Sequence, residues 1–354
     1  MRHIFKGKAV SSLIAVVPSE ERSFDEEYGN YGISESKARK YKETMGFDRH
    51  RVVSAEVTTA DLCERAFLAL VDSGALKKQE VGALVFITQT PDYFLPPTSN
   101  VLQGKLGLGQ DVVCMDINQG CAGFVFGMMQ AFLLLDIPAI DKVVVLVGDT
   151  ASKQVSPRNR ASYPMVGDGA AAFVVERMAE QSDVYFDCRM DGARYQTLIV
   201  PAGAYRQMSS AETLAVRDDE SGIPRSLEHI RMDGPAILSF TMSDVLHQIQ
   251  GCLEFSRKSI DSIEAYIFHQ PNRFVLQSMA DKLGVARDRL PSNIVGLYGN
   301  CSSASIPLNI AHNYRDILLE RKMQVCFSGF GVGLTWLTAV MEFGPLRCCE
   351  IIEY

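Results

Sequence analysis

Short apolar runs that alternate with helix-like stretches are the feature that most constrains the fold of this chain. In the first half they span residues 11–17, 81–88, 112–117, 142–147 and 170–175. Strands that are apolar on both faces and are separated by helices are typical of sheets covered by helices on each side. The pattern therefore predicts an α/β protein in which all five runs, 112–117 included, are buried strands.

The second half repeats this order of elements. It contains a predicted strand, a long helix, a second strand and two strands around a Gly-rich turn, at 184–190, 237–255, 265–268, 325–328 and 335–342. A charged stretch near residue 178 divides the chain into an N-terminal half, 1–178, and a C-terminal half, 179–354. The stretch 201–224 is rich in Ala, Ser and Gly and is predicted to be a mobile surface loop.

Composition and charge exclude several classes of protein. The 354 residues are 47% hydrophobic and 22% charged, which is ordinary for a globular protein. A net charge of −7 without a basic run argues against nucleic acid as the main partner. No run of about 18 apolar residues occurs, so we expect no membrane insertion, and the N-terminus lacks the core of a signal peptide.

The cysteines point to a reduced compartment. There are nine of them, an odd number, scattered without paired spacing. Adjacent Cys348 and Cys349 cannot form an ordinary structural bridge. A disulfide framework or a zinc cluster is therefore not expected, and no metal site is predicted. We expect a cytoplasmic protein with reduced, mostly buried thiols.

One cysteine lies where a predicted strand turns into a helix. The strand ends near Ile117, Gly120 allows a tight turn, and 124–135 has the length and composition of a helix. At a helix N-terminus the backbone N–H groups and the helix dipole stabilise a thiolate. Cys121 is therefore a candidate nucleophile, and the alternative is a small buried residue in a tight turn.

One histidine directly follows a predicted strand. His269 comes after 265–268 and precedes polar residues and a helix-like stretch, 273–283, which suits an active-site imidazole. The alternative is a histidine hydrogen-bonded at the edge of the core. The remaining histidines lack this setting: His50 lies in a charged run and is expected to be exposed, and His247 lies on a helix.

Two glycine-containing segments complete the candidate site. Asn300 follows Gly299 in a run of small residues, where its amide could donate a hydrogen bond to a carbonyl, although a turn asparagine is the simpler alternative. The segment 328–336 is a Gly-rich turn between strands, whose N–H groups could form half of an oxyanion hole. Because it leads into a strand and no Lys-Ser/Thr pair follows, a phosphate cradle is disfavoured.

In this order along the chain, these motifs resemble the ketoacyl-acyl carrier protein synthase III enzymes of the thiolase superfamily. The resemblance extends over residues 8–343. It rests on the segments 116–124, 167–170, 269–272, 298–307 and 329–336, with Pro96 after the aromatic-rich loop 91–95. It implies a thiolase-like fold, with duplicated βαβ-rich halves in a five-layer αβαβα arrangement, and a homodimer.

The resemblance also implies an acyltransferase that performs a decarboxylative condensation. Cys121 would take an acyl group from a thioester of coenzyme A or acyl carrier protein. His269 and Asn300 would hold malonyl-acyl carrier protein and stabilise the enolate formed as carbon dioxide leaves. The carbanion would attack acyl-Cys121, giving a 3-oxoacyl thioester for fatty acid or related acyl-chain biosynthesis. The backbone N–H groups of Cys121 and Val332 would form the oxyanion hole, and no metal or organic cofactor is implied.

The implied pocket departs from the family's usual residues. Its members are Leu95, Asn272, Arg273, Phe274, Gly331 and Gly333. Leu95 replaces a bulkier aromatic at the subunit contact, which predicts room for a longer or branched primer. Val332 replaces a glycine in a role that uses only the backbone. The tail, 344–354, extends past the usual end of the family.

The implied docking surface for the carrier protein is also altered. Four positions that are usually basic around the tunnel mouth hold Asp48, Ser239, Phe274 and Asp281. Lys282 remains basic, and Arg273 is a partial substitute. These replacements call coenzyme A into question as the carrier of the primer.

Other functions remain open on the sequence alone. The same fold could support a non-condensing acyltransferase or a hydrolase, or a type III polyketide synthase, which usually carries proline where Val332 stands. A thiolase without decarboxylation would use a second cysteine as base, for which Cys301 is a slight indication. An idle, dimer-stabilising subunit is disfavoured because Cys121, His269 and Asn300 are all present.

Overall fold

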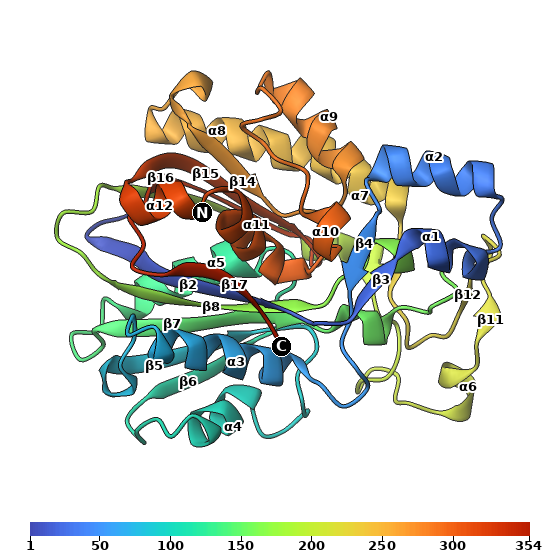
Figure 1. Cartoon of the computed structure of the whole chain (residues 1–354), viewed down its shortest axis with the longest axis horizontal. Coiled ribbons are helices and arrows are strands. Elements are labelled where there is room, and N and C mark those ends of the chain that lie inside the picture. The colour runs from blue at the N-terminus through green and yellow to red at the C-terminus, as the bar shows by residue number, and fades with distance from the viewer.

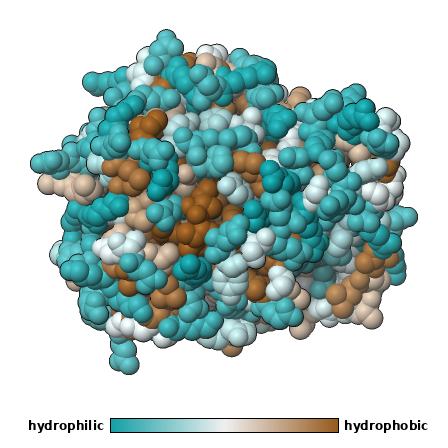
Figure 2. Space-filling model, in the orientation of Figure 1, coloured by the Kyte–Doolittle hydropathy of each residue, from teal (hydrophilic) through white to brown (hydrophobic).

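A computed structural model describes all 354 residues, and two sheets with helices between and outside them form its framework (Figure 1). No helix is long and apolar enough to span a bilayer. The face seen in Figure 2 is mostly polar, with apolar residues gathered in several separate patches.

The first sheet has six strands in the order β17-β2-β8-β7-β5-β6. Their bounds are β2 Lys8–Val17, β5 Val81–Ile87, β6 Val113–Ile117, β7 Lys142–Asp149, β8 Gly169–Arg177 and β17 Cys349–Glu353. Strand β5 is parallel to both β6 and β7, whereas β8 is antiparallel to β7 and to β2. The carboxyl ends of β5, β6 and β7 therefore meet at one edge of the sheet.

The second sheet has five strands in the order β1-β9-β16-β15-β14. Their bounds are β1 Arg2–Phe5, β9 Val184–Met190, β14 Ala265–Phe268, β15 Met323–Gly331 and β16 Thr335–Phe343. Strands β14 and β15 are parallel, and the remaining neighbours are antiparallel. The carboxyl ends of β14 and β15 thus lie side by side.

The helices complete five alternating layers, as Figure 1 shows. The outer face of the first sheet is covered by α3 (Thr59–Asp72) and α4 (Thr98–Lys105), and that of the second by α8 (Leu246–Ser256) and α9 (Arg273–Leu283). Between the sheets, α5 (Gly123–Leu134) and α11 (Ser305–Asn313) lie in the largest buried cluster. A helix packed on both sides must be apolar over most of its surface, which explains why Gln130 is the only polar side chain of α5. The predicted thiolase-like α/β fold is confirmed.

Shorter elements connect these layers. They are β3 Glu21–Ser23, α1 Phe24–Glu27, α2 Glu35–Met45, β4 Arg49–Arg51, β10 Leu198–Ile199, α6 Ala211–Leu214, β11 Arg217–Asp218, β12 Pro224–Arg225, β13 Arg231–Met232, α7 Gly234–Phe240, α10 Val295–Tyr298 and α12 Arg315–Glu320. The stretch 201–224, predicted to be a loop, contains α6 and β11. The predicted helix at 237–255 is present as α7, a π-helical turn at Thr241–Val245, and α8.

Each end of the chain joins the sheet formed mainly by the opposite half. Strand β1 pairs with β9 in the second sheet. The C-terminal tail supplies β17, which runs parallel to β2 with Cys349 opposite Leu13. The tail is therefore an added edge strand of the first sheet. The boundary near residue 178 stays a prediction.

Two expectations from the sequence were wrong. Strand β6 is not buried on both faces: it is the edge of its sheet, and Val113 is 42% exposed because no strand covers that side. His50 is buried rather than exposed, because its ring packs against Tyr163. Its Nδ1 contacts the Val166 carbonyl oxygen at 2.6 Å and its Nε2 the Glu27 carboxylate at 2.9 Å.

Candidate active site

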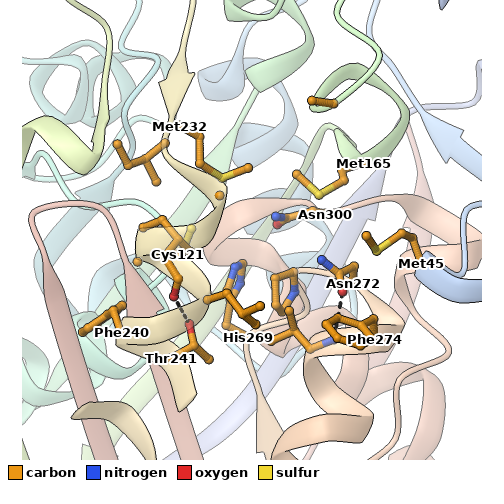
Figure 3. Close-up of a pocket in the computed structure, with 18 of the residues that line it drawn as sticks. Met45, Cys121, Met165, Met232, Phe240, Thr241, His269, Asn272, Phe274 and Asn300 are labelled. Carbon is orange, nitrogen blue, oxygen red and sulfur yellow. Dashed lines mark hydrogen bonds between the residues drawn. The ribbon is translucent and has the colours of Figure 1, made fainter. Parts of the chain in front are cut away.

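A cavity of about 530 Å³ opens at the carboxyl ends of the strands and contains Cys121, His269 and Asn300 together (Figure 3). Its wall is mainly apolar. The lining includes Met45, Phe47, Met165, Leu198, Met232, Ile237, Leu238, Phe240, Phe274, Val275 and Phe330. A mainly apolar cavity with these three polar groups in its wall suits a substrate with an apolar chain and one reacting centre.

Cys121 lies in the turn between β6 and α5. The Gly123 N–H donates to the Gly120 carbonyl oxygen at 2.6 Å, which closes the turn, and the thiol reaches the cavity. Gly331 packs against it so closely that an added Cβ would lie 2.9 Å from the sulfur. Only glycine at the end of β15 leaves this room.

The expected thiolate stabilisation is outweighed by burial. Burial, followed by the charge of Asp149, raises the pKa of the Cys121 thiol to about 11. The Ser302 hydroxyl and the backbone N–H groups of Cys121 and Val332 act on the sulfur in the opposite direction, with smaller effect. The thiol is therefore protonated at pH 7 in the resting fold, and the oxyanion hole of Cys121 and Val332 stays a prediction.

His269 follows β14 directly and is buried. Its Nδ1 contacts the Ser305 hydroxyl at 2.9 Å, and its backbone N–H donates to the Ser328 carbonyl oxygen at 2.9 Å. Burial lowers the pKa of the imidazole to about 4, so the ring is neutral at pH 7.

Asn300 is held by its backbone and by its own side chain. Its N–H donates to the Met165 carbonyl oxygen at 2.6 Å, and its carbonyl accepts from Gly167 N–H at 3.2 Å. The side-chain oxygen accepts the Ser302 N–H at 3.0 Å. The amide NH₂ group makes no hydrogen bond with the protein and is left to donate into the cavity.

The predicted pocket residues separate into two groups. Asn272, Phe274 and Gly331 line the cavity, and Asn272 also caps α9 by accepting the Val275 N–H at 2.9 Å. Leu95, Arg273 and Gly333 do not line it; Leu95 is 76% exposed on the surface of the chain.

The two predicted docking residues differ in their surroundings. Arg273 packs its side chain across Gly46, and its guanidinium lies 3.5 Å from the Glu43 carbonyl oxygen. Lys282, in the last turn of α9, is exposed and forms no ion pair. The side chain of Arg273 is therefore engaged within the fold, whereas that of Lys282 is free.

Several lining residues were not identified from the sequence. Met165 comes from the short 3₁₀ helix Tyr163–Met165 and Met232 from the two-residue strand β13. Phe240 and Thr241 come from the junction of α7 with the π-helical turn. The signal that could have found the last two is the apolar face of the helix predicted at 237–255. Asp149 and Ser302, which act on the thiol, carried no signal beyond ordinary strand-end and turn positions.

Comparisons with known proteins agree with this geometry. The family model described as 3-oxoacyl-[acyl-carrier-protein (ACP)] synthase III matches residues 115–192, and its C-terminal counterpart matches 253–343. The β-ketoacyl-[acyl-carrier-protein] synthase III of Streptococcus gordonii is 31% identical over 83% of this chain and 87% of its own.

Two solved structures extend the comparison over the whole fold. The 3-oxoacyl-(acyl-carrier protein) synthase of Burkholderia xenovorans LB400 superimposes with a TM-score of 0.93 at 32% identity, covering 100% of this chain and 99% of its own. The 3-oxoacyl-(acyl carrier protein) synthase III of Pseudomonas aeruginosa PAO1 superimposes with a TM-score of 0.80 at 25% identity, covering 96% of this chain and 99% of its own. The chain belongs to the 3-oxoacyl-[acyl-carrier-protein] synthase III family.

Proposed function

We propose that this chain condenses an acyl thioester primer with malonyl-acyl carrier protein through an acyl-Cys121 intermediate. The observation that carries the proposal is the meeting of a thiol, a neutral imidazole and a free amide NH₂ at one apolar cavity. Loss of carbon dioxide generates the carbanion, so no strong base is required. A neutral ring and an amide are therefore sufficient to stabilise the developing enolate.

The steps follow from the positions of these groups. The Cys121 sulfur attacks the primer carbonyl, the N–H groups of Cys121 and Val332 stabilise the oxyanion, and the primer's carrier leaves as a thiol. Malonyl thioester then binds with its carbonyl between His269 and Asn300. Carbon dioxide leaves, and the carbanion attacks the acyl-Cys121 carbonyl to give the 3-oxoacyl thioester. We propose that no metal or organic cofactor takes part.

Acyl carrier protein is the carrier that the surface charges favour. Asp48 Oδ1 lies 2.8 Å from Lys42 Nζ, and Asp281 Oδ2 lies 2.8 Å from Arg287 Nη2. The charges of these two acidic residues, which stand where basic residues were expected, are therefore neutralised within the fold. Phe274 presents an apolar ring at the cavity where a cation would bind the phosphates of coenzyme A. Lys282 is the residue that we assign to carrier-protein docking, in preference to Arg273.

A homodimer is the assembly that we propose. Strand β6 is an unpaired edge, and the loop after β5 exposes the large side chains of Tyr93, Phe94 and Leu95. An open edge strand and a group of exposed large side chains are each usually covered in the native assembly. If Leu95 reaches the partner's acyl pocket there, its small size leaves room for a longer or branched primer. A cytoplasmic location remains a prediction.

Mass spectrometry of the intact protein tests the proposal. The protein is incubated with acyl thioesters of two to twelve carbons, straight and branched, on coenzyme A and on acyl carrier protein, with Cys121→Ala as control. Acylation of the wild type alone, followed by a 3-oxoacyl product when malonyl-acyl carrier protein is added, supports it. Acylation without release of carbon dioxide would instead favour a non-condensing acyltransferase. A product formed from acetyl primer only would refute the assignment to Leu95.

A further inference from the structure

A buried carboxylate, Asp149, lies behind the nucleophile and has no part in the mechanism above. It is the last residue of β7 and is 1% exposed. Its Oδ1 accepts the Thr88 hydroxyl at 3.0 Å and the Gln89 N–H at 2.6 Å, both from the end of β5. Its Oδ2 is buried without a well-formed hydrogen bond. One oxygen is therefore held in place, and the other lacks a partner.

Ser302 connects this carboxylate to the thiol. The short helix Ser302–Ala304 packs against β7, which ends at Asp149, and against α5, which follows Cys121. The Ser302 hydroxyl lowers the pKa of both groups. The Oγ atom is buried, and it too lacks a well-formed hydrogen bond in the resting site. The backbone of Ser302 has a φ of 48°, a left-handed conformation that is uncommon for residues other than glycine. A hydroxyl can accept one hydrogen bond while donating another, so Ser302 can pass a proton between its two neighbours.

The charge states of the Asp149 carboxyl group and the Cys121 thiol depend on each other. Burial raises the pKa of Asp149 to about 6, and the charge of Asp149 adds to burial in raising the pKa of Cys121. The other titratable groups that face Asp149 are Asp168, Cys63 and Cys301, and none of them is a cation. Two adjacent negative charges are costly in such surroundings, so the thiol can ionise readily only when the carboxylate gains a proton.

We propose that Ser302 and Asp149 form a proton relay that activates Cys121 for acylation. As the sulfur attacks the primer carbonyl, the thiol proton passes to Ser302 Oγ while the Ser302 hydroxyl proton passes to Asp149 Oδ2. The bond between Cys121 sulfur and carbonyl carbon forms, the bond to the donor's sulfur breaks, and the donor thiolate takes a proton from solvent. This inference rests on the proposed function.

The relay returns the proton in the second half of the cycle. When the carbanion attacks acyl-Cys121, the Cys121 sulfur leaves as a thiolate, and Asp149 protonates it through Ser302. The proton taken from solvent by the donor thiolate balances the loss of the malonyl carboxylate as carbon dioxide. Asp149 and Ser302 are therefore positioning groups that act through Cys121.

Rapid-quench acylation of Cys121 tests the relay directly. Asp149→Asn keeps the shape but cannot accept the proton, and Ser302→Ala removes the hydroxyl. Each is expected to slow acylation about 100-fold, in the range for loss of general base assistance. Ser303→Ala is the matched control, because Ser303 carries a neighbouring buried hydroxyl without a partner and has no contact with the thiol in this scheme. Wild-type acylation should rise towards pH 6 and level off, whereas Asp149→Asn should lose that inflection.

Decarboxylation separates a relay from a folding defect. Release of carbon dioxide from malonyl thioester depends on His269 and Asn300, so a general disturbance of the site would lower it in parallel with acylation. The relay predicts that Asp149→Asn and Ser302→Ala slow the acylation of Cys121 much more than they slow the release of carbon dioxide. An Asp149→Asn variant that acylates at the wild-type rate with an unchanged inflection near pH 6 would overturn the proposal.

Alkylation by iodoacetamide keeps the test independent of the acyl donor. Iodoacetamide reacts with thiolates. A thiol that shares its proton with Asp149 gives a rate that levels off between about pH 6 and pH 8, because one negative charge is distributed over the pair. Asp149→Asn should instead show a tenfold rise per pH unit over that range. A tenfold rise in the wild type as well refutes the relay; a plateau without acylation by any thioester refutes the proposed function alone.

Discussion

The side-chain oxygen of Asn300 accepts a hydrogen bond from the backbone N–H of Ser302 at 3.0 Å. This contact fixes the amide so that its NH₂ group, and not its oxygen, is free to donate into the cavity. The hydroxyl of the same Ser302 lowers the pKa of the Cys121 thiol. One short turn thus orients an amide donor at the cavity and supplies a hydroxyl that acts on the thiol.

Replacing Asn300 by Asp should separate the two half-reactions. A carboxylate cannot donate to the developing enolate and repels its charge, so decarboxylation of malonyl-acyl carrier protein should fall by about 10²–10³, or about 2.7–4 kcal/mol. Acylation of Cys121 should persist, because its oxyanion donors belong to other residues. Carbon dioxide release and intact mass measure the two steps separately, and equal losses in both would contradict the assignment.

Replacing Gly331 by Ala should displace the nucleophile. The added methyl group would lie 2.8 Å from the Cys121 Cβ and 2.9 Å from its sulfur, so one of the two segments must shift. We expect a loss of about 1–3 kcal/mol in the free energy of unfolding, as for other overpacked sites, and at least a 100-fold slower acylation. Gly192→Ala is the control, because nothing lies within 4 Å of a Cβ added there. Normal acylation by Gly331→Ala would show that the turn tolerates movement.

The three candidate residues could be picked out because each adjoins a patterned element. An apolar strand before His269, an apolar helix after Cys121 and glycine before Asn300 are local signals. Their meeting at one cavity depends on how the two sheets pack, because β6 and β14 belong to different sheets. The apolar wall was not predictable in the same way, since Met165 and Met232 come from segments without periodicity.

Burial of single polar groups was the part that the sequence did not specify. His50 lies in a charged run, and only the folded chain shows that Glu27 and the Val166 carbonyl enclose it. The helix N-terminus marked Cys121 as a candidate, but the raised pKa of its thiol follows from long-range packing and from Asp149. Similarly, β6 has the composition of a central strand, and its place at the edge depends on the order of strands.

Acid should destabilise the protein through His269. Its folded pKa of about 4 lies below the usual 6.5, so the unfolded chain binds the proton more tightly, and stability that is complete above pH 6.5 is lost as pH falls towards 4. Between pH 7 and pH 5 the wild type should lose about 2 kcal/mol of unfolding free energy relative to His269→Gln. Denaturant titrations of both proteins at the two pH values measure this difference. Equal pH dependence in the two would mean that the ring is not neutral in the fold.

Replacing Phe274 by Arg should improve the use of coenzyme A thioesters. A cation at the cavity would attract the phosphates of coenzyme A, and because Phe274 is 40% exposed the gain should be limited to about fivefold in KM. Salt should weaken the effect, since exposed charges are screened. Phe274→Met controls for loss of the ring. A salt-independent change in KM would indicate an effect on the shape of the cavity.

Replacing Leu95 by Asp should dissociate the proposed dimer without unfolding the chain. The side chain is 76% exposed in the single chain, so the stability of the monomer should change by less than about 0.5 kcal/mol. Burying a charge in an apolar interface should weaken association by about 2 kcal/mol, or roughly 30-fold in Kd. Sedimentation across a concentration series measures the shift, with Leu133→Asp, on an exposed position of α5, as a matched control. If both variants retain the wild-type Kd, the interface lies elsewhere, and the assignment of Leu95 to the partner's acyl pocket fails with it.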